Sequence, residues 1–376
     1  MVDKNNKIRQ SLKIAKKRFL QKKLKLFVVT ISTNTSLDTN KAYLAPLREI
    51  DDKLIFGVIV YSQSQLVNIC RTIDKVADVI FVDAEKKIPF SIGDKFLKRI
   101  PFSIDDKFLK IIKERQSTNE YVELGNLVST VKLLTEKPIV REFKPNDITV
   151  EHAWLTLIKH FETFGAKKVA IIGSGNIGFK LALKLVESGV AVELYRRDVT
   201  KNMFLSNAIN LVKPESTLAN SNVSTDKIKA SIFADAIVGC SNLPNVINID
   251  MIKAMKPGGL ILDIGKANLT YEAINYAKKI NIKIMRCDIN KSICNYINFY
   301  SNYLFQEDNF GYKYFNKRLK LISGGYIGNR DDIVVDEFHS PKQILGISDG
   351  LGKFKKKYTL QDKKNLKKIK KYFSIK

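Results

Sequence analysis

The segment from Lys168 to Asp198 constrains the fold of this chain more than any other part of the sequence. It consists of an apolar run of strand length, a turn, a stretch with one apolar helical face, and a second apolar run. The turn carries glycines with the spacing Gly-x-Gly-x-x-Gly, at Gly173, Gly175 and Gly178. That spacing is weak evidence by itself, but between a strand and a helix it is typical of a dinucleotide-binding unit.

A different physical requirement explains the glycine at each of the three positions. Gly173 permits the tight turn, Gly175 lets the backbone approach a pyrophosphate, and Gly178 lets the helix pack closely against the strand. The amides of the first helical turn then point at the bound anion. The contacts expected from this turn are Gly173, Ser174, Gly175, Asn176, Ile177 and Gly178. A related nucleoside-cofactor fold and a domain that has lost its ligand are the alternatives.

The end of the second apolar run indicates which dinucleotide binds. An acid at this point would accept a hydrogen bond from the adenosine 2′-hydroxyl of NAD. The chain instead has Arg196 and Arg197, whose guanidinium groups can hold the 2′-phosphate of NADP. Glu193 lies nearer the usual offset, but it alternates with Val192 and Leu194 inside the strand. We therefore predict NADP, with NAD less favoured, and a solvated strand end is the alternative for the arginines.

Two later apolar runs, at 234–239 and 260–263, fit further strands of the same sheet, and 282–288 fits another. In an open parallel sheet the ligand binds beyond the carboxyl ends of the strands. We expect the first exit loop to lie along the nicotinamide ribose and a glycine after the second run to allow close approach to the ring. The residues expected there are Cys240, Ser241, Asn242 and Gly265.

The run from Thr149 to Gly265 resembles the NADP domain of the shikimate and quinate dehydrogenases, and of the related glutamyl-tRNA reductases and methylenetetrahydrofolate dehydrogenases. The shared features are an inter-domain helix, the glycine-rich turn, a basic strand end, and the strands Asp-Ala-Ile-Val-Gly and Pro-Gly-Gly-Leu-Ile-Leu-Asp-Ile-Gly. The resemblance covers about a third of the chain. It implies an NADP-dependent oxidoreductase of the amino-acid-dehydrogenase-like group, with a substrate domain before the NADP domain and a C-terminal return of the chain. The shikimate enzymes have Gly-Gly-Ala where this chain has Gly175-Asn176-Ile177.

The first part of the chain alternates strand-like and helical runs. Strands are predicted at 25–32, 54–61 and 78–83, and a helix at 64–75, which indicates a parallel sheet. A helix over 149–164, capped by Thr149, is expected to lead into the second domain. The fold class is therefore α/β, a Rossmann domain with an N-terminal parallel α/β substrate domain. The predicted segments are a basic amphipathic tail at 1–25, the substrate domain at 26–148, the NADP domain at 149–310, a return segment at the cleft at 311–352, and a basic tail at 353–376.

A tandem duplication interrupts the first domain. The sequence Ile-Pro-Phe-Ser-Ile at residue 88 returns at residue 100, and both copies continue to Asp-Lys-Phe-Leu-Lys. Two copies do not make a solenoid. We interpret them as a duplicated surface loop, with a flap over the substrate as the alternative.

The formal net charge of +26 lies mostly at the two ends. Residues 1–25 hold ten Lys and Arg against one acid, and residues 353–376 hold eleven Lys against one acid, so the body carries 26 − 9 − 10 = +7. We interpret this charge as solvated, and a nucleic-acid partner for the basic ends is the weaker alternative. The first run has Ile8, Leu12 and Phe19 at helical spacing, which predicts an amphipathic helix that docks on its own domain.

Hydride transfer needs a group that moves the accompanying proton, commonly Lys, His or a carboxylate. Asp38 and Lys41 lie in a polar loop after the first strand, and Asp83 and Glu85 follow the third. His339 lies in a glycine-rich and charged C-terminal segment, and an unperturbed imidazole titrates near neutral pH. The catalytic candidates are therefore Lys41, Asp38 and His339.

The remaining composition narrows the class of protein. No apolar run is long enough to span a bilayer, no secretory leader is evident, and the four cysteines have neither metal-ligand nor disulfide-framework spacing. We expect a reduced, cytoplasmic protein with no metal, acting on a small polar substrate, with a homodimer left open. The alternative function is a non-catalytic NADP-binding sensor or scaffold whose basic ends contact nucleic acid or an acidic surface.

Overall fold

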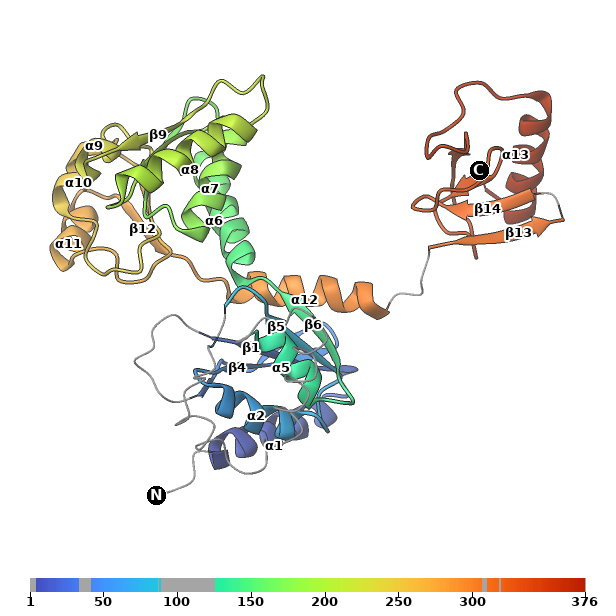
Figure 1. Cartoon of the computed structure of the whole chain (residues 1–376), viewed down its shortest axis with the longest axis horizontal. Coiled ribbons are helices and arrows are strands. Elements are labelled where there is room, and N and C mark those ends of the chain that lie inside the picture. Colours follow the sequence, from blue (N-terminus) through green and yellow to red (C-terminus); the bar gives the residue numbers. More distant parts are fainter. Residues whose placement is uncertain are drawn as a thin grey trace, which may run out of the picture. The chain divides into compact units, whose positions relative to one another are not determined.

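The computed structural model forms two compact units, Met1–Phe299 and Tyr300–Lys376 (Figure 1). The residues described are 5–33, 42–86, 88, 126–305, 310–317 and 319–375. The first unit contains two six-stranded sheets, and the second contains one of four strands. Helices and mainly parallel strands alternate through the first unit, which confirms the predicted α/β class.

The first sheet has four parallel strands and two short antiparallel ones. Its strands are β1 (Leu26–Ser32), β2 (Tyr43–Leu44), β3 (Arg48–Ile50), β4 (Lys53–Ile59), β5 (Val79–Asp83) and β6 (Ile139–Phe143). The order is β2-β4-β1-β5-β6, and β3 also pairs with β4. The pairs β4/β1, β1/β5 and β5/β6 are parallel, which confirms the sheet predicted from the alternating runs.

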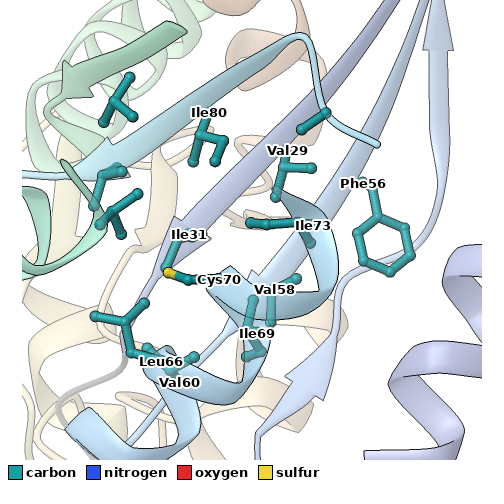
Figure 2. Close-up of a cluster of buried hydrophobic side chains, with 14 of the residues drawn as sticks. Val29, Ile31, Phe56, Val58, Val60, Leu66, Ile69, Cys70, Ile73 and Ile80 are labelled. Carbon is teal, nitrogen blue, oxygen red and sulfur yellow. The ribbon is translucent and has the colours of Figure 1, made fainter. Parts of the chain in front are cut away.

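Within the described residues, the helices α1 (Asn5–Gln21), α2 (Gln63–Ile73) and α5 (Leu127–Leu134) contribute to the core of the first sheet. Leu12 and Ala15 of α1 are buried in the same core as the strands, and Ile8 and Phe19 pack against it. The prediction that the basic N-terminal helix docks on its own domain is confirmed, because its apolar stripe contributes to this core. Figure 2 shows part of this core, with Val29, Ile31, Phe56, Val58, Val60, Leu66, Ile69, Cys70, Ile73 and Ile80 labelled.

The second sheet is entirely parallel, with the order β12-β11-β10-β7-β8-β9. Its strands are β7 (Lys168–Ile172), β8 (Ala191–Tyr195), β9 (Ser221–Ser224), β10 (Ala236–Gly239), β11 (Leu260–Asp263) and β12 (Lys283–Arg286). Its helices are α6 (Pro145–Phe161), α7 (Asn176–Glu187), α8 (Val199–Val212), α9 (Lys227–Ser231), α10 (Ile249–Ala254) and α11 (Tyr271–Lys279). Helix α12 (Asn290–Phe305) follows β12 but contacts the first sheet, where Asn290 accepts a hydrogen bond from Arg48 of β3 and Asn298 Nδ2 donates to Asp51 Oδ2 at 2.6 Å. Counted from β7, the strand order is 3-2-1-4-5-6, which is the order of dinucleotide-binding domains.

Helix α6 begins earlier than the sequence predicted. Pro145 is its first residue, and Thr149 lies one turn inside, where its Oγ1 donates a 2.8 Å hydrogen bond to the Pro145 carbonyl. Proline fits this first position because its missing N–H would have no acceptor there. The predicted cap at Thr149 is therefore wrong, although the helix itself is present.

The described part of the second unit contains a four-stranded sheet and a helix that packs on it. Its elements are β13 (Tyr312–Asn316), β14 (Leu319–Ser323), β15 (Ile333–Val335), β16 (Ile344–Ile347) and α13 (Leu360–Phe373). Leu321, Ile333 and Ile347 share a buried core with Ile369 of α13. The C-terminal basic run forms the helix α13, which packs on this sheet. Among the residues described, none of the helices is both long and apolar enough to cross a bilayer.

Candidate functional site

The glycine-rich turn joins β7 to α7, at the point where the order of the strands reverses. Gly173 has a φ of +109°, and a Cβ atom there would lie 2.8 Å from the carbonyl carbon of Cys240. A Cβ atom at Gly178 would lie 2.1 Å from the carbonyl oxygen of Gly173. Both positions therefore require glycine because the turn packs tightly on β10 and on α7.

Gly175 differs from these two glycines. Its backbone is extended, with a φ of −76°, and a Cβ atom there would meet no atom within 4 Å. It precedes α7, and the first amides of a helix have no acceptor inside the helix. Asn176 is exposed, whereas Ile177 packs against the core of the second sheet. The open space beside Gly175 therefore fits the approach of a pyrophosphate to these amides.

Ser174 and Asn202 fix the turn on the side of β8. Ser174 is 1% exposed, and its Oγ donates to Asn202 Oδ1 at 2.6 Å. Asn202 of α8 is fully buried, and its Nδ2 donates to the Leu194 carbonyl at 3.0 Å. The Ser174 side chain is thus used within the protein, where it fixes the turn against α8. Asn202 was not predicted as part of this turn, since an asparagine inside a helix carries no distinctive pattern.

The two arginines at the end of β8 lie in different surroundings. Arg196 is half-buried, and its Nη1 donates to the Ser174 carbonyl at 3.1 Å, so its guanidinium lies against the glycine-rich turn. Arg197 is exposed. The next residue, Asp198, caps α8 by accepting a hydrogen bond from the Lys201 amide at 2.9 Å. The carboxylate nearest to these arginines in sequence is therefore already used by the helix.

Glu193 lies within β8 and has partners of its own. Its Oε1 accepts a 3.3 Å hydrogen bond from Asn222 Nδ2 and lies 3.8 Å from Lys168 Nζ. Lys168 is the first residue of β7, so this pair lies toward the amino end of the sheet. The position agrees with the interpretation of Glu193 as an internal strand residue.

The exit loop of β10 begins at Cys240, whose amide donates to the Ile172 carbonyl at 2.8 Å. Burial raises the pKa of the Cys240 thiol, and burial with Asp288 nearby raises the pKa of Cys287 to about 12. Both thiols stay protonated at neutral pH and are poor nucleophiles. Cys240 can therefore contribute its backbone groups and the volume of its side chain to a site, but not a reactive thiolate. Ser241 is half-buried and Asn242 is exposed.

Gly265 follows β11, and its missing side chain has a different reason from the one predicted. A Cβ atom there would lie 2.0 Å from the Ser241 carbonyl oxygen and 2.7 Å from Asn268 Oδ1. The space is filled by the protein's own atoms. Glycine at 265 thus allows two loops of the chain to approach each other, whereas the sequence suggested an approach by the nicotinamide ring.

The carboxyl edge of the first sheet carries several acids. Asp83 is buried and accepts from Ser32 Oγ at 2.6 Å and from the Glu85 amide at 2.9 Å. Glu85 Oε1 lies 3.2 Å from Nζ of Lys180, which is one helical turn after the start of α7 and also binds Asp147. Burial lowers the pKa of Lys180, but its hydrogen bonds to the two acids outweigh burial and the pKa is raised. This edge therefore contacts the helix that follows the glycine-rich turn.

The predicted catalytic residues are not brought to this site by any described contact. Asp38 and Lys41 lie outside the described residues, as does the duplicated segment apart from Ile88. His339 is exposed in the second unit, with its ring 4.2 Å from that of Phe338, so its catalytic role stays a prediction. Within the described ranges, no group of three or more His, Cys, Asp or Glu side chains could hold a metal ion.

Comparison with known proteins gives matches only at the level of structure. No protein-family model and no curated protein matches the chain. A shikimate dehydrogenase in complex with NADP+ is 15% identical, with 70% of this chain and 85% of that chain covered and a TM-score of 0.38. L-tryptophan dehydrogenase from Nostoc punctiforme is 13% identical, with 75% of this chain and 76% of that chain covered and a TM-score of 0.39. Ornithine carbamoyltransferase from Gloeobacter violaceus is 11% identical, with 71% and 85% covered and a TM-score of 0.35. These matches include dehydrogenases and a carbamoyltransferase, so they do not select one activity.

Proposed function

We propose that the second sheet binds NADP and that the chain is an NADP-dependent oxidoreductase. The observation that carries the proposal is the open space at Gly175, in front of the first amides of α7 and at the reversal of strand order. Gly173 and Gly178 are required by packing, whereas Gly175 has no such requirement within the protein. A ligand that must approach the backbone accounts for glycine at this position.

The residues around this space would hold the two ends of the cofactor differently. The amides at the start of α7 would bind the pyrophosphate, and Arg196 beside Ser174 would bind the 2′-phosphate, with Arg197 adding positive charge. The Cys240 to Asn242 loop would flank the nicotinamide half. When bound, NADP would supply the hydride-transfer chemistry that amino-acid side chains lack.

The substrate would bind at the carboxyl edge of the first sheet, where parallel sheets place their ligands. Described groups at that edge are polar, namely Ser32, Glu85 and Lys86, whose Nζ donates to the Thr33 carbonyl at 3.1 Å. This polarity supports a small polar substrate. Lys41 and Asp38 follow the first strand of the same sheet, and we keep them as the groups proposed to move the proton.

The alternative function is a non-catalytic NADP-binding sensor or scaffold whose basic ends contact nucleic acid or an acidic surface. The apolar faces of α1 and α13 pack into the cores of their own units and leave most of their lysines exposed, so this packing is compatible with both functions. NADPH consumption in the presence of small polar carbonyl compounds distinguishes the two functions. An enzyme oxidises NADPH only when a substrate is added, whereas a sensor binds NADPH without consuming it.

The direct test of the cofactor site is Gly175→Val. The extended backbone and the open space accommodate valine, so the variant should fold normally. Its side chain would occupy the space of the pyrophosphate, and calorimetric titration should show NADPH affinity reduced by at least about 100-fold, from loss of several charge-assisted hydrogen bonds.

The matched control is Gly165→Val, in the exposed loop before β7, where the nearest atom to a Cβ is Thr163 Oγ1 at 3.9 Å. This variant should bind NADPH like the wild type. If folded Gly175→Val retains wild-type affinity, the assignment of the site is wrong.

A further inference from the structure

Asn268 holds the exit loop of β10 by three hydrogen bonds. The residue is fully buried after β11. Its Nδ2 donates to the carbonyl oxygens of Ser241 at 2.8 Å and Leu243 at 3.0 Å, and its Oδ1 accepts from the Ser241 amide at 3.2 Å. The Asn268 side chain thus supplies hydrogen-bond partners to the loop backbone beyond the end of β10, as a neighbouring strand would do within the sheet.

Two glycines make room for this side chain. A Cβ atom at Gly239, the last residue of β10, would lie 2.5 Å from Asn268 Oδ1. A Cβ atom at Gly265 would lie 2.7 Å from the same oxygen. The ends of both strands are therefore shaped around Asn268.

The loop that carries Asn268 is itself held in an unfavourable backbone conformation. Lys266 and Ala267 have φ values of +67° and +57°. This left-handed region of the backbone is unfavourable for residues other than glycine. The buried carboxylate of Asp263 accepts from the Lys266 amide at 2.9 Å and from the Asn268 amide at 3.3 Å. Consecutive residues of this kind persist only where surrounding contacts determine the conformation, and they cluster at ligand sites.

The place of this arrangement in the sheet suggests what it does. β10 lies on the opposite side of β7 from β8, whose end carries the arginines. A dinucleotide that spans the reversal of strand order puts its adenosine half toward β8 and its nicotinamide half toward β10. The loop that Asn268 holds is therefore the one beside the nicotinamide half.

We propose that Asn268 is a positioning residue, which fixes the Ser241 to Leu243 loop in the conformation that receives the nicotinamide half of NADP. The role rests on the proposed function. Asn202 is its counterpart on the adenosine side, since it is also fully buried and holds Ser174 and the Leu194 carbonyl. The same substitution at the two asparagines should therefore have different effects on the two halves of the cofactor.

The experiment measures the affinity of Asn268→Asp and Asn202→Asp for two probes, NADPH and 2′-phospho-ADP-ribose, which lacks nicotinamide. Aspartate keeps the size of asparagine but removes the Nδ2 donor. Asn268→Asp should weaken NADPH about 10-fold or more and leave the fragment within about twofold of wild type, whereas Asn202→Asp should weaken both probes equally. A neutral variant, Asn268→Ser, should repeat the selective pattern without a buried charge.

Each outcome decides the proposal. Equal loss of both probes in folded Asn268→Asp and Asn268→Ser, or no loss of either, would reject a positioning role for Asn268. If neither Asn268 variant folds, as judged by circular dichroism, the residue serves folding and the proposal is also rejected. A wild-type protein that binds neither probe would instead refute the proposed function itself.

Discussion

At the scale of single residues, glycines with the same spacing have unequal roles. Gly173 and Gly178 are required by contacts with the protein's own backbone, whereas the side-chain position of Gly175 is open. Their spacing could be identified in the sequence, because the pattern is local. The space beside each glycine depends on distant residues, so it became visible only in the folded structure.

Gly178→Ala should destabilise the second sheet. The added Cβ would lie 2.1 Å from a backbone oxygen that cannot move without moving the turn, so we expect a loss of about 3 kcal/mol in the free energy of unfolding. Trp154 is the single tryptophan and hydrogen-bonds Ser188, the residue after α7, so its fluorescence during denaturant unfolding reports on this region.

Gly175→Ala is the control for this experiment and should unfold like the wild type, since its Cβ meets no protein atom within 4 Å. Equal stability of Gly178→Ala and Gly175→Ala would contradict the packing described for the turn.

At the scale of elements, the two lysine-rich ends of the chain also carry apolar residues that pack into the cores. The two basic ends contain α1 and α13, whose lysines are mostly exposed while Leu12 and Ile369 are buried. Helical spacing predicted the first of these helices because periodicity is a local property. The start of α6 was misplaced because Thr149 and Pro145 are both residues that begin helices, and the choice between them depends on the strand that precedes the helix.

Asp362 at the start of α13 should make the helix sensitive to pH. It is buried and accepts from Lys355 Nζ at 2.6 Å and from the Thr359 amide at 2.8 Å. Burial raises its pKa, but these hydrogen bonds outweigh burial and hold the pKa below its ordinary value of 3.8. A lowered pKa gives stability that is present above the ordinary value and is lost as the pH falls through the folded one.

Asp362→Asn should therefore reduce the hydrogen-exchange protection of α13 amides by about 1–2 kcal/mol at neutral pH, the usual size of a capping effect. The difference from wild type should shrink below about pH 4. Asp331→Asn is the control, because Asp331 also binds Lys355 but is exposed and caps no helix. A pH-independent difference would contradict the role of the Asp362 charge.

At the scale of the whole molecule, the sequence predicted the two parallel sheets and the dinucleotide turn, because alternating strands and helices are encoded locally. It did not predict Asn202, Asn268 or the contact between Glu85 and Lys180, because these depend on residues from distant segments meeting in the fold. The candidate proton donors Asp38 and Lys41 lie outside the described residues, and their role stays a prediction.

The most direct test of the central claim is the ratio of NADP affinity to NAD affinity. It is measured at one ionic strength for the wild type, Arg196→Asp and Arg197→Asp. Both substitutions change the net charge equally, but only Arg196 contacts the glycine-rich turn through Ser174. The wild type should prefer NADP, and Arg196→Asp should lower the ratio by roughly 10- to 150-fold, the size of a lost charge-assisted hydrogen bond, with a smaller effect at Arg197. A wild type that prefers NAD, or a ratio that neither substitution changes, would contradict the assignment of this chain as an NADP-dependent protein.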